Sequence, residues 1–130
     1  MSTILVAGAT GYLGRFIVAE LHRRGYQVRA LVRDLGRAES PGIYGSPSLT
    51  GLVADWRIGD VTNPHVTADL AHGVTGVISA LGVTRQKADP WDIDYRANLA
   101  ILDSARRHGV NNFCYVHALG AEHCPARITR

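Results

Sequence analysis

The stretch GATGYLG, Gly8–Gly14, follows the apolar run Ile4–Ala7 and precedes residues with helical spacing. A turn between a strand and a helix uses such glycines to turn tightly, to admit a pyrophosphate close to the backbone and to pack the helix on the strand. Unpaired N–H groups and the helix dipole then attract phosphate. The spacing differs by one residue from Gly-x-Gly-x-x-Gly. It predicts a dinucleotide-binding turn; the alternative is a glycine turn that serves packing only.

The rest of the chain alternates strand patterns with helical ones. Strands are expected over residues 3–7, 26–32, 52–58, 76–81 and 112–116, and helices over residues 13–24, 64–72 and 92–107, with a short helical turn at 35–39. Asp55 and Arg57 alternate with apolar residues in the third strand, as is typical of an edge strand. This alternation predicts one α/β domain over residues 1–130, with a Rossmann-type, doubly wound parallel sheet of about five strands in the order 3-2-1-4-5.

Composition excludes several other classes. The chain has 130 residues, 46% of them hydrophobic, and a net charge of +3 from scattered basic residues, so neither nucleic acid nor a membrane is an expected partner. Two cysteines form no disulfide framework, and a cytoplasmic location is expected. Cys114, His117, His123 and Cys124 lack the spacing of a metal site, so no metal is expected. Cys114 is expected to point into the sheet.

The end of the second strand indicates which dinucleotide is bound. An acid at this place typically holds a ribose 2′-hydroxyl, whereas a basic residue accommodates a 2′-phosphate. Here the strand is followed by Arg33 and then Asp34. Arg33, assisted by Arg15 after the last glycine, favours NADP(H) over NAD(H). Asp34 favours the opposite, and a solvated Arg33–Asp34 surface pair is the alternative.

These motifs together resemble a known family. The segments ILVAGATGYLGRFIV, ALVRD, GDVT, VISALG and NLAILDSARRHGVNNFCYVHALGAE are similar to the N-terminal half of atypical short-chain dehydrogenase/reductases, in particular the NmrA-like, NAD(P)H-binding subgroup. The resemblance implies a pyrophosphate contact for Gly8, Thr10, Gly11, Tyr12, Leu13 and Gly14, a 2′-phosphate contact for Arg33, an adenine contact for Asp60 and Val61, and a ribose-side contact for Ala80, Leu81 and Gly82. Asn98 matches the family's helix asparagine, with an exposed polar position as the alternative.

The departures from the family concern catalysis. Many members use a Tyr-x-x-x-Lys pair, in which lysine lowers the tyrosine pKa for proton exchange with the substrate. The only lysine here is Lys87, and no tyrosine precedes it by four residues. His117 replaces the serine that usually follows the fifth strand. It is a candidate acid or base, and the alternative is a cofactor-facing or surface role without chemistry. Family members are also longer, because a further part supplies the sixth strand and the substrate pocket.

Two functions therefore stay open. The chain is interpreted as the cofactor domain of an oxidoreductase of unknown substrate, or as a non-catalytic dinucleotide-binding redox sensor or structural subunit. We expect no turnover from these 130 residues alone. We also expect self-association through a sheet edge or helix face that the shortened fold leaves uncovered.

Overall fold

The computed structural model describes residues 2–81 and 90–116 of the chain. Its strands are β1 (Thr3–Ala7), β2 (Gln27–Val32), β3 (Asp55–Ile58), β4 (Gly76–Ser79) and β5 (Phe113–Tyr115). Its helices are α1 (Tyr12–Arg23), α2 (Leu35–Glu39), α3 (Pro64–Thr67) and α4 (Pro90–Arg107), with a 3₁₀ turn at Ile43–Gly45. All strand pairs are parallel and follow the order β3-β2-β1-β4-β5, which confirms the predicted fold class and strand order.

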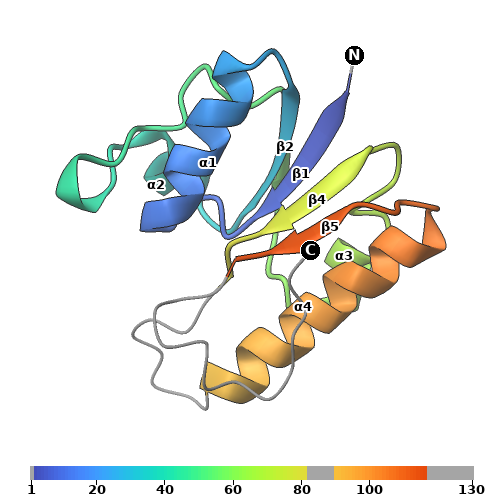
Figure 1. Ribbon diagram of the computed structural model, residues 1–130. Helices are drawn as coiled ribbons and strands as arrows, with labels where there is room; N and C mark the ends of the chain where they lie inside the picture. The colour runs from blue at the N-terminus through green and yellow to red at the C-terminus, as the bar shows by residue number, and fades with distance from the viewer. Residues whose placement is uncertain (1, 82–89, 117–130) are drawn as a thin grey trace.

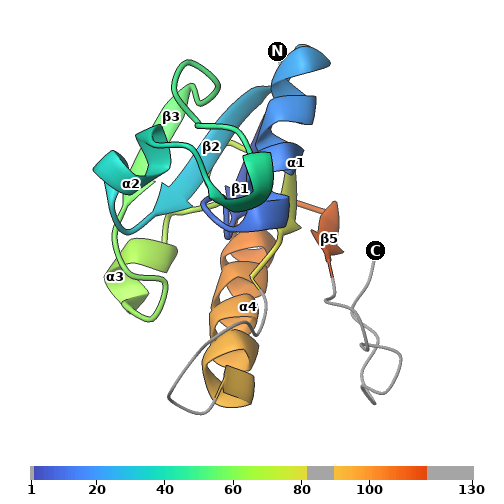
Figure 2. The ribbon, with the colours of Figure 1, turned by 90° about the vertical axis from the view of Figure 1, so that its left-hand side faces the viewer.

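The helices cover both faces of this sheet. In Figure 1, α1 and α2 lie on one side of the strands and α3 and α4 on the other, and Figure 2 shows the same layers after a quarter turn. From β1 the chain passes to β2 on one side, and later returns to β4 on the other side of β1. The strand order therefore reverses beside β1, which is the usual ligand position in a doubly wound sheet.

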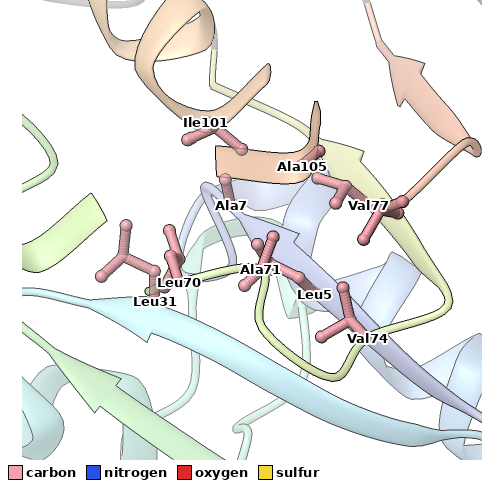
Figure 3. Close-up of a cluster of buried hydrophobic side chains, with 10 residues drawn as sticks. Leu5, Ala7, Leu31, Leu70, Ala71, Val74, Val77, Ile101 and Ala105 are labelled. Atoms are coloured by element: carbon pink, nitrogen blue, oxygen red, sulfur yellow. The ribbon is translucent and has the colours of Figure 1, made fainter. Parts of the chain in front are cut away.

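Side chains of alternating strand residues divide the core into two layers. Leu5 and Ala7 of β1 point toward α3 and α4, where they pack with Ile101 and Ala105 (Figure 3). Val6 lies between them in sequence and packs on the opposite face, against the layer under α1 and α2. The buried residues of each layer are aliphatic, so burial on both sides holds the strands in one register and fixes where their carboxyl ends lie.

Some predicted boundaries differ from the observed ones. The third strand begins at Asp55 rather than at residue 52, because Leu52 N donates to Leu49 O in a turn that precedes the strand. The helix predicted over 64–72 ends at Thr67, and hydrogen-bonded turns replace its second half. On α1, Leu13 and Phe16 are exposed, while Gly14 and Val18 face the sheet.

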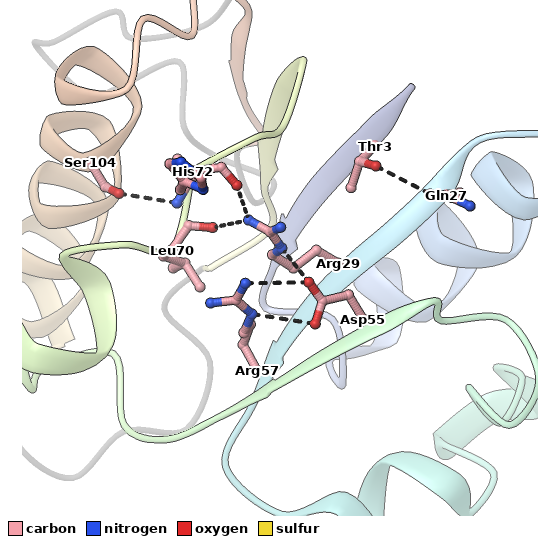
Figure 4. A network of polar contacts seen from close by, with 9 residues as sticks. Thr3, Gln27, Arg29, Asp55, Arg57, Leu70, His72 and Ser104 are labelled. Atoms are coloured by element: carbon pink, nitrogen blue, oxygen red, sulfur yellow. Dashed lines mark hydrogen bonds and ion pairs between the residues drawn. The ribbon is translucent and has the colours of Figure 1, made fainter. Parts of the chain in front are cut away.

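A polar network connects the edge strand β3 to β2 and to the segment after α3. Arg29 of β2 is 9% exposed and donates to Asp55 at 2.8 Å and to the carbonyl oxygens of Leu70 and His72 (Figure 4). Arg57 donates to the same Asp55 carboxylate. Burial raises the pKa of Asp55, but the hydrogen bonds from Arg57 and Arg29 outweigh it and leave that pKa below 3.8. The network joins β2, β3 and the segment after α3, so it fixes the edge strand.

Two expectations about surfaces bear on partners. Within the described residues, no helix is both long and apolar enough to cross a membrane. β3 and β5 each pair on one side only within that part of the chain. The self-association expected through such an edge stays a prediction.

Candidate functional site

The glycine turn lies between β1 and α1 at the carboxyl end of the sheet. Gly8 has φ +74°, and a Cβ there would come within 2.8 Å of Leu81 N, so only glycine lets these two loops touch. A Cβ on Gly14 would overlap the carbonyl oxygen of Gly8. Gly11 differs, because its Cβ would meet only that same oxygen, at an ordinary 3.4 Å. Gly8 and Gly14 therefore serve packing, while Gly11 leaves open space.

That open space leads to the start of α1. Gly11 is the N-cap residue and supplies no side chain to the first turn. The first intrahelical bond is donated by Arg15 N to Gly11 O, so the N–H groups of Tyr12, Leu13 and Gly14 precede any intrahelical partner. A helix start of this kind attracts phosphate through its N–H groups and its dipole. The expected contacts of these three residues are therefore contacts of the backbone.

A pocket of about 580 Å³ extends from this turn across the ends of β1, β2 and β3. Seven of the residues expected to bind a cofactor line it: Gly8, Thr10, Gly11, Arg33, Asp60, Val61 and Leu81. The pocket is also lined by Leu31, Val32, Asp34, Arg37, Gly59, Thr62 and Ala97. Tyr12, Leu13, Gly14 and Ala80 do not line it, and Gly82 lies outside the described residues. The volume and the elongated lining suit a ligand with several phosphate and ring groups.

The basic side of the pocket contains two arginines. Arg33 follows β2, and Arg37 lies one turn of α2 later; both are exposed. Within the described residues, no hydrogen bond or ion pair engages either guanidinium group. Asp34, between them, is the N-cap of α2 and accepts from Arg37 N at 3.2 Å. One oxygen of this carboxylate thus caps the helix. No Arg33–Asp34 ion pair forms among the described residues, so the predicted alternative of a surface pair is wrong.

Asp60 faces the two arginines from the loop after β3. One carboxylate oxygen accepts from Thr62 N at 2.9 Å and from Thr62 Oγ1 at 2.8 Å. These bonds, first from the backbone and then from the hydroxyl, lower the pKa of Asp60, and the charge of Arg33 lowers it further. Asp60 is therefore ionised at neutral pH, with its second oxygen left to accept from a ligand.

Arg15 has a role that the sequence did not predict. It is 2% exposed, and its guanidinium donates to the carbonyl oxygens of Thr10, Arg37, Ser40 and Pro47 at 2.6–3.1 Å. Burial, and then repulsion from Arg37, lowers the pKa of Arg15. The expectation that Arg15 contacts a 2′-phosphate is wrong, because the side chain is buried and four of its five N–H groups donate to backbone carbonyl oxygens.

Two buried polar side chains hold the loop after β4. Ser79 donates a short hydrogen bond to Asn98 Oδ1, and both side chains are buried. Leu81 N also reaches Ser79 Oγ at 3.4 Å, which fixes the loop that touches Gly8. The exposed alternative for Asn98 is therefore wrong. Its helical spacing among apolar residues was the available signal for burial.

The remaining candidates concern catalysis and metals. His117 lies outside the described residues, as do His123 and Cys124. Cys114 is exposed, which corrects its expected position: Phe113 packs on the core layer under α4, so strand alternation turns Cys114 to the other face. Within the described part of the chain, no three His, Cys, Asp or Glu side chains gather as metal ligands.

Comparison with known proteins finds relatives over most of this chain. The chain is 39% identical over 129 residues to a divinyl chlorophyllide a 8-vinyl-reductase, chloroplastic, of Zea mays, covering 91% of the chain and 30% of that protein. It is 32% identical over 123 residues to photosystem II assembly factor Ycf39 of Cyanophora paradoxa, covering 92% and 35%. The chain thus spans about a third of the length of these relatives.

Comparison with solved structures finds a similar fold in short-chain dehydrogenase/reductases. A short-chain dehydrogenase/reductase superfamily protein from Agrobacterium tumefaciens with bound NAD superposes with a TM-score of 0.65 at 27% identity, covering 87% of this chain and 31% of that one. The resemblance to short-chain dehydrogenase/reductases is confirmed. The NAD(P)H-binding family matches residues 8–129, a range that contains the glycine turn, both pocket arginines and Asp60. The chain belongs to the NAD(P)H-binding family and is a nicotinamide dinucleotide-binding domain.

Proposed function

We propose that the chain binds NADPH in preference to NADH and is the cofactor domain of a reductase. The observation that carries the proposal is the pair Arg33 and Arg37 on the pocket wall, which outnumber the single carboxylate of Asp34 between them. A guanidinium fork matches a phosphate in geometry and charge. An acid at this place would favour NADH instead. Asp34 also lines the pocket, but one of its carboxylate oxygens caps α2, and two guanidinium groups flank it.

The other pocket residues fit the rest of the dinucleotide. The first-turn N–H groups of α1 suit the pyrophosphate, and the open side of Gly11 admits it close to the backbone. Asp60 offers a carboxylate oxygen to the adenine amino group, and Val61 and Ala97 offer apolar contact. When bound, NADPH supplies a hydride; the chain's own residues bind and orient it.

The reductase half of the proposal rests on two supports. One relative is named for the reduction of a vinyl group, and the cofactor site is present in this chain. The other relative is named as an assembly factor, which keeps a non-catalytic binding role as the competing function. The Tyr-x-x-x-Lys pair is absent from this sequence, so hydride transfer here needs a proton donor of another kind. His117 stays a weak candidate for it.

Calorimetric titration with NADPH and NADH tests the preference. We expect NADPH to bind about ten- to hundredfold more tightly, which corresponds to roughly 1.5–3 kcal/mol for a charge-assisted contact. Arg33→Ala and Arg37→Ala should each reduce that ratio, and salt should weaken NADPH binding more than NADH binding.

Arg106→Ala is the matched control. Arg106 is an exposed arginine in the last turn of α4, so its loss changes net charge equally without touching the pocket. Equal affinity of the wild-type chain for the two cofactors contradicts the proposed preference. A ratio that falls as much in Arg106→Ala as in Arg33→Ala contradicts the assignment to the pocket arginines.

A further inference from the structure

The buried guanidinium of Arg15 connects two separate parts of the site. Its Nε donates to Thr10 O at 3.0 Å, within the glycine turn. Its Nη atoms donate to Arg37 O at 3.0 Å, at the end of α2, and to Ser40 O and Pro47 O in the following loop. One side chain thus holds the backbone of the pyrophosphate turn and the backbone of a pocket arginine.

The two parts depend on Arg15 to different degrees. The glycine turn has its own support, because Gly11 N bonds to Gly8 O and Gly14 packs on the Gly8 carbonyl. Arg33 is likewise placed directly by β2 and its ladder. α2 has only five residues and depends on tertiary contacts. Besides Arg15, these are the buried side chain of Ala38 and the bonds from Leu49 N and Ser48 Oγ to carbonyl groups of α2. Three of the four carbonyl groups bound by Arg15 belong to α2 and the loop after it.

We infer that Arg15 is a positioning residue for cofactor discrimination: it holds α2 so that Arg37 reaches the 2′-phosphate. This inference rests on the proposed preference for NADPH. It assigns Arg15 no contact with the cofactor, since four carbonyl groups take its donors and it is 2% exposed.

A variant at Arg15 should therefore change the ratio of two dissociation constants, and not only stability. Arg15→Lys keeps the charge but loses the fork that spans several carbonyl groups. We expect it to weaken NADPH binding about three- to tenfold, a fraction of one charge-assisted contact, and to change NADH binding less. A residue with a structural role alone would weaken both cofactors equally.

A double-mutant cycle shows whether Arg15 acts through Arg37. In the Arg37→Ala background, Arg15→Lys should no longer change the NADPH-to-NADH ratio, whereas in the Arg33→Ala background it should still do so. Equal effects of Arg15→Lys in both backgrounds overturn the inference. A wild-type ratio near one refutes the proposed preference instead, so the two failures are distinguishable.

Two further measurements apply if Arg15 variants do not fold. Gly42→Ala keeps Arg15, but its Cβ would lie 2.7 Å from Cδ and Nε of Arg15 and closer still to Ser46 Oγ. It therefore displaces both side chains and should lower the same ratio. In the wild-type chain, hydrogen exchange of Arg15 Nε–H, followed by NMR, should slow more with saturating NADPH than with saturating NADH. Equal protection by the two cofactors, or an unchanged ratio in folded Gly42→Ala, overturns the inference.

Discussion

Replacing Gly11 tests whether the open side of the glycine turn is where the cofactor binds. An ideal Cβ at Gly11 meets only the Gly8 carbonyl oxygen, at 3.4 Å, and its φ of −73° suits any residue. Gly11→Val should therefore fold, with a loss of about 1 kcal/mol because valine is a poor N-cap residue. The added methyl groups point to the space that a pyrophosphate needs beside the first turn of α1.

The same geometry gives the expected loss of NADPH affinity in Gly11→Val. If the side chain keeps the pyrophosphate from one charge-assisted N–H contact, binding weakens by about 1.5–3 kcal/mol, or about ten- to hundredfold in Kd. Calorimetry with NADPH measures this loss, and urea unfolding measures stability in parallel. Gly11→Ala, with a smaller side chain, should lie between wild type and Gly11→Val in affinity.

Gly14→Ala is the comparison that separates folding from binding. Its Cβ would overlap the backbone of Gly8, so it should destabilise the fold itself, by more than Gly11→Val does. Equal NADPH affinity of wild type and folded Gly11→Val refutes the reasoning, because the turn then lies outside the binding site.

Three further predictions concern stability and turnover. Asp55→Asn should cost about 1–2 kcal/mol at pH 7, a value discounted for the partial exposure of Asp55, since Arg29 loses its charged partner. Because folding lowers the pKa of Asp55, its contribution to the free energy of unfolding is present above the ordinary pKa of 3.8 and is lost as the pH falls through the lower folded pKa. Urea unfolding should therefore show a difference in stability between wild type and Asp55→Asn at neutral pH that disappears at acid pH. A difference that stays constant with pH contradicts the sign. Ser79→Ala should cost about 1–3 kcal/mol in urea unfolding because Asn98 loses a buried partner, and an unchanged midpoint contradicts that role. The 130-residue chain should bind NADPH without oxidising it in the presence of quinones, aldehydes or ketones, since the proton-relay pair is absent. The absorbance of NADPH measures its oxidation. Oxidation that is lost in Gly11→Val and in His117→Ala contradicts this prediction and assigns His117 a catalytic role.

The fold was predictable because each local signal agreed with the others. The apolar run before Gly8 and the Asp55–Arg57 alternation indicated a central and an edge strand, and the sheet has β1 in its interior and β3 at its edge. Successive strand residues take opposite faces, as Leu5 and Val6 do, but the continuous apolar run Ile4–Ala7 does not indicate which face each one takes. Boundaries were less predictable, since the turn before β3 depends on Leu52 N bonding back to Leu49 O.

The site was predictable where it depends on backbone and strand ends. The positions of Gly11, Arg33 and Asp60 follow from the carboxyl edge of a parallel sheet, and all three line the pocket. Arg37 was missed, although Asp34 as an N-cap residue signalled a helix turn that brings Arg37 near Arg33.

Arg15 was misplaced because its partners are distant in sequence. Its place directly after Gly14 suggested a phosphate contact at the start of α1. Its side chain instead bonds to carbonyl groups 25 and 32 residues away, in a loop with no regular pattern. No periodicity in the sequence specifies where those carbonyl groups lie, so only the three-dimensional structure reveals the clamp.

The central claim is that a nicotinamide dinucleotide occupies the pocket between the glycine turn and two arginines, Arg33 after β2 and Arg37 in α2. Amide NMR titration of the ¹⁵N-labelled chain with NADPH tests it most directly, because each backbone N–H reports its own surroundings. We predict the largest shifts at Gly11, Tyr12, Leu13 and Gly14, with saturable shifts at the Arg33 and Arg37 side-chain Nε–H. Shifts confined to the opposite end of the sheet, around Gly25–Val28 and Gly51–Ala54, or no saturable shifts, would contradict it.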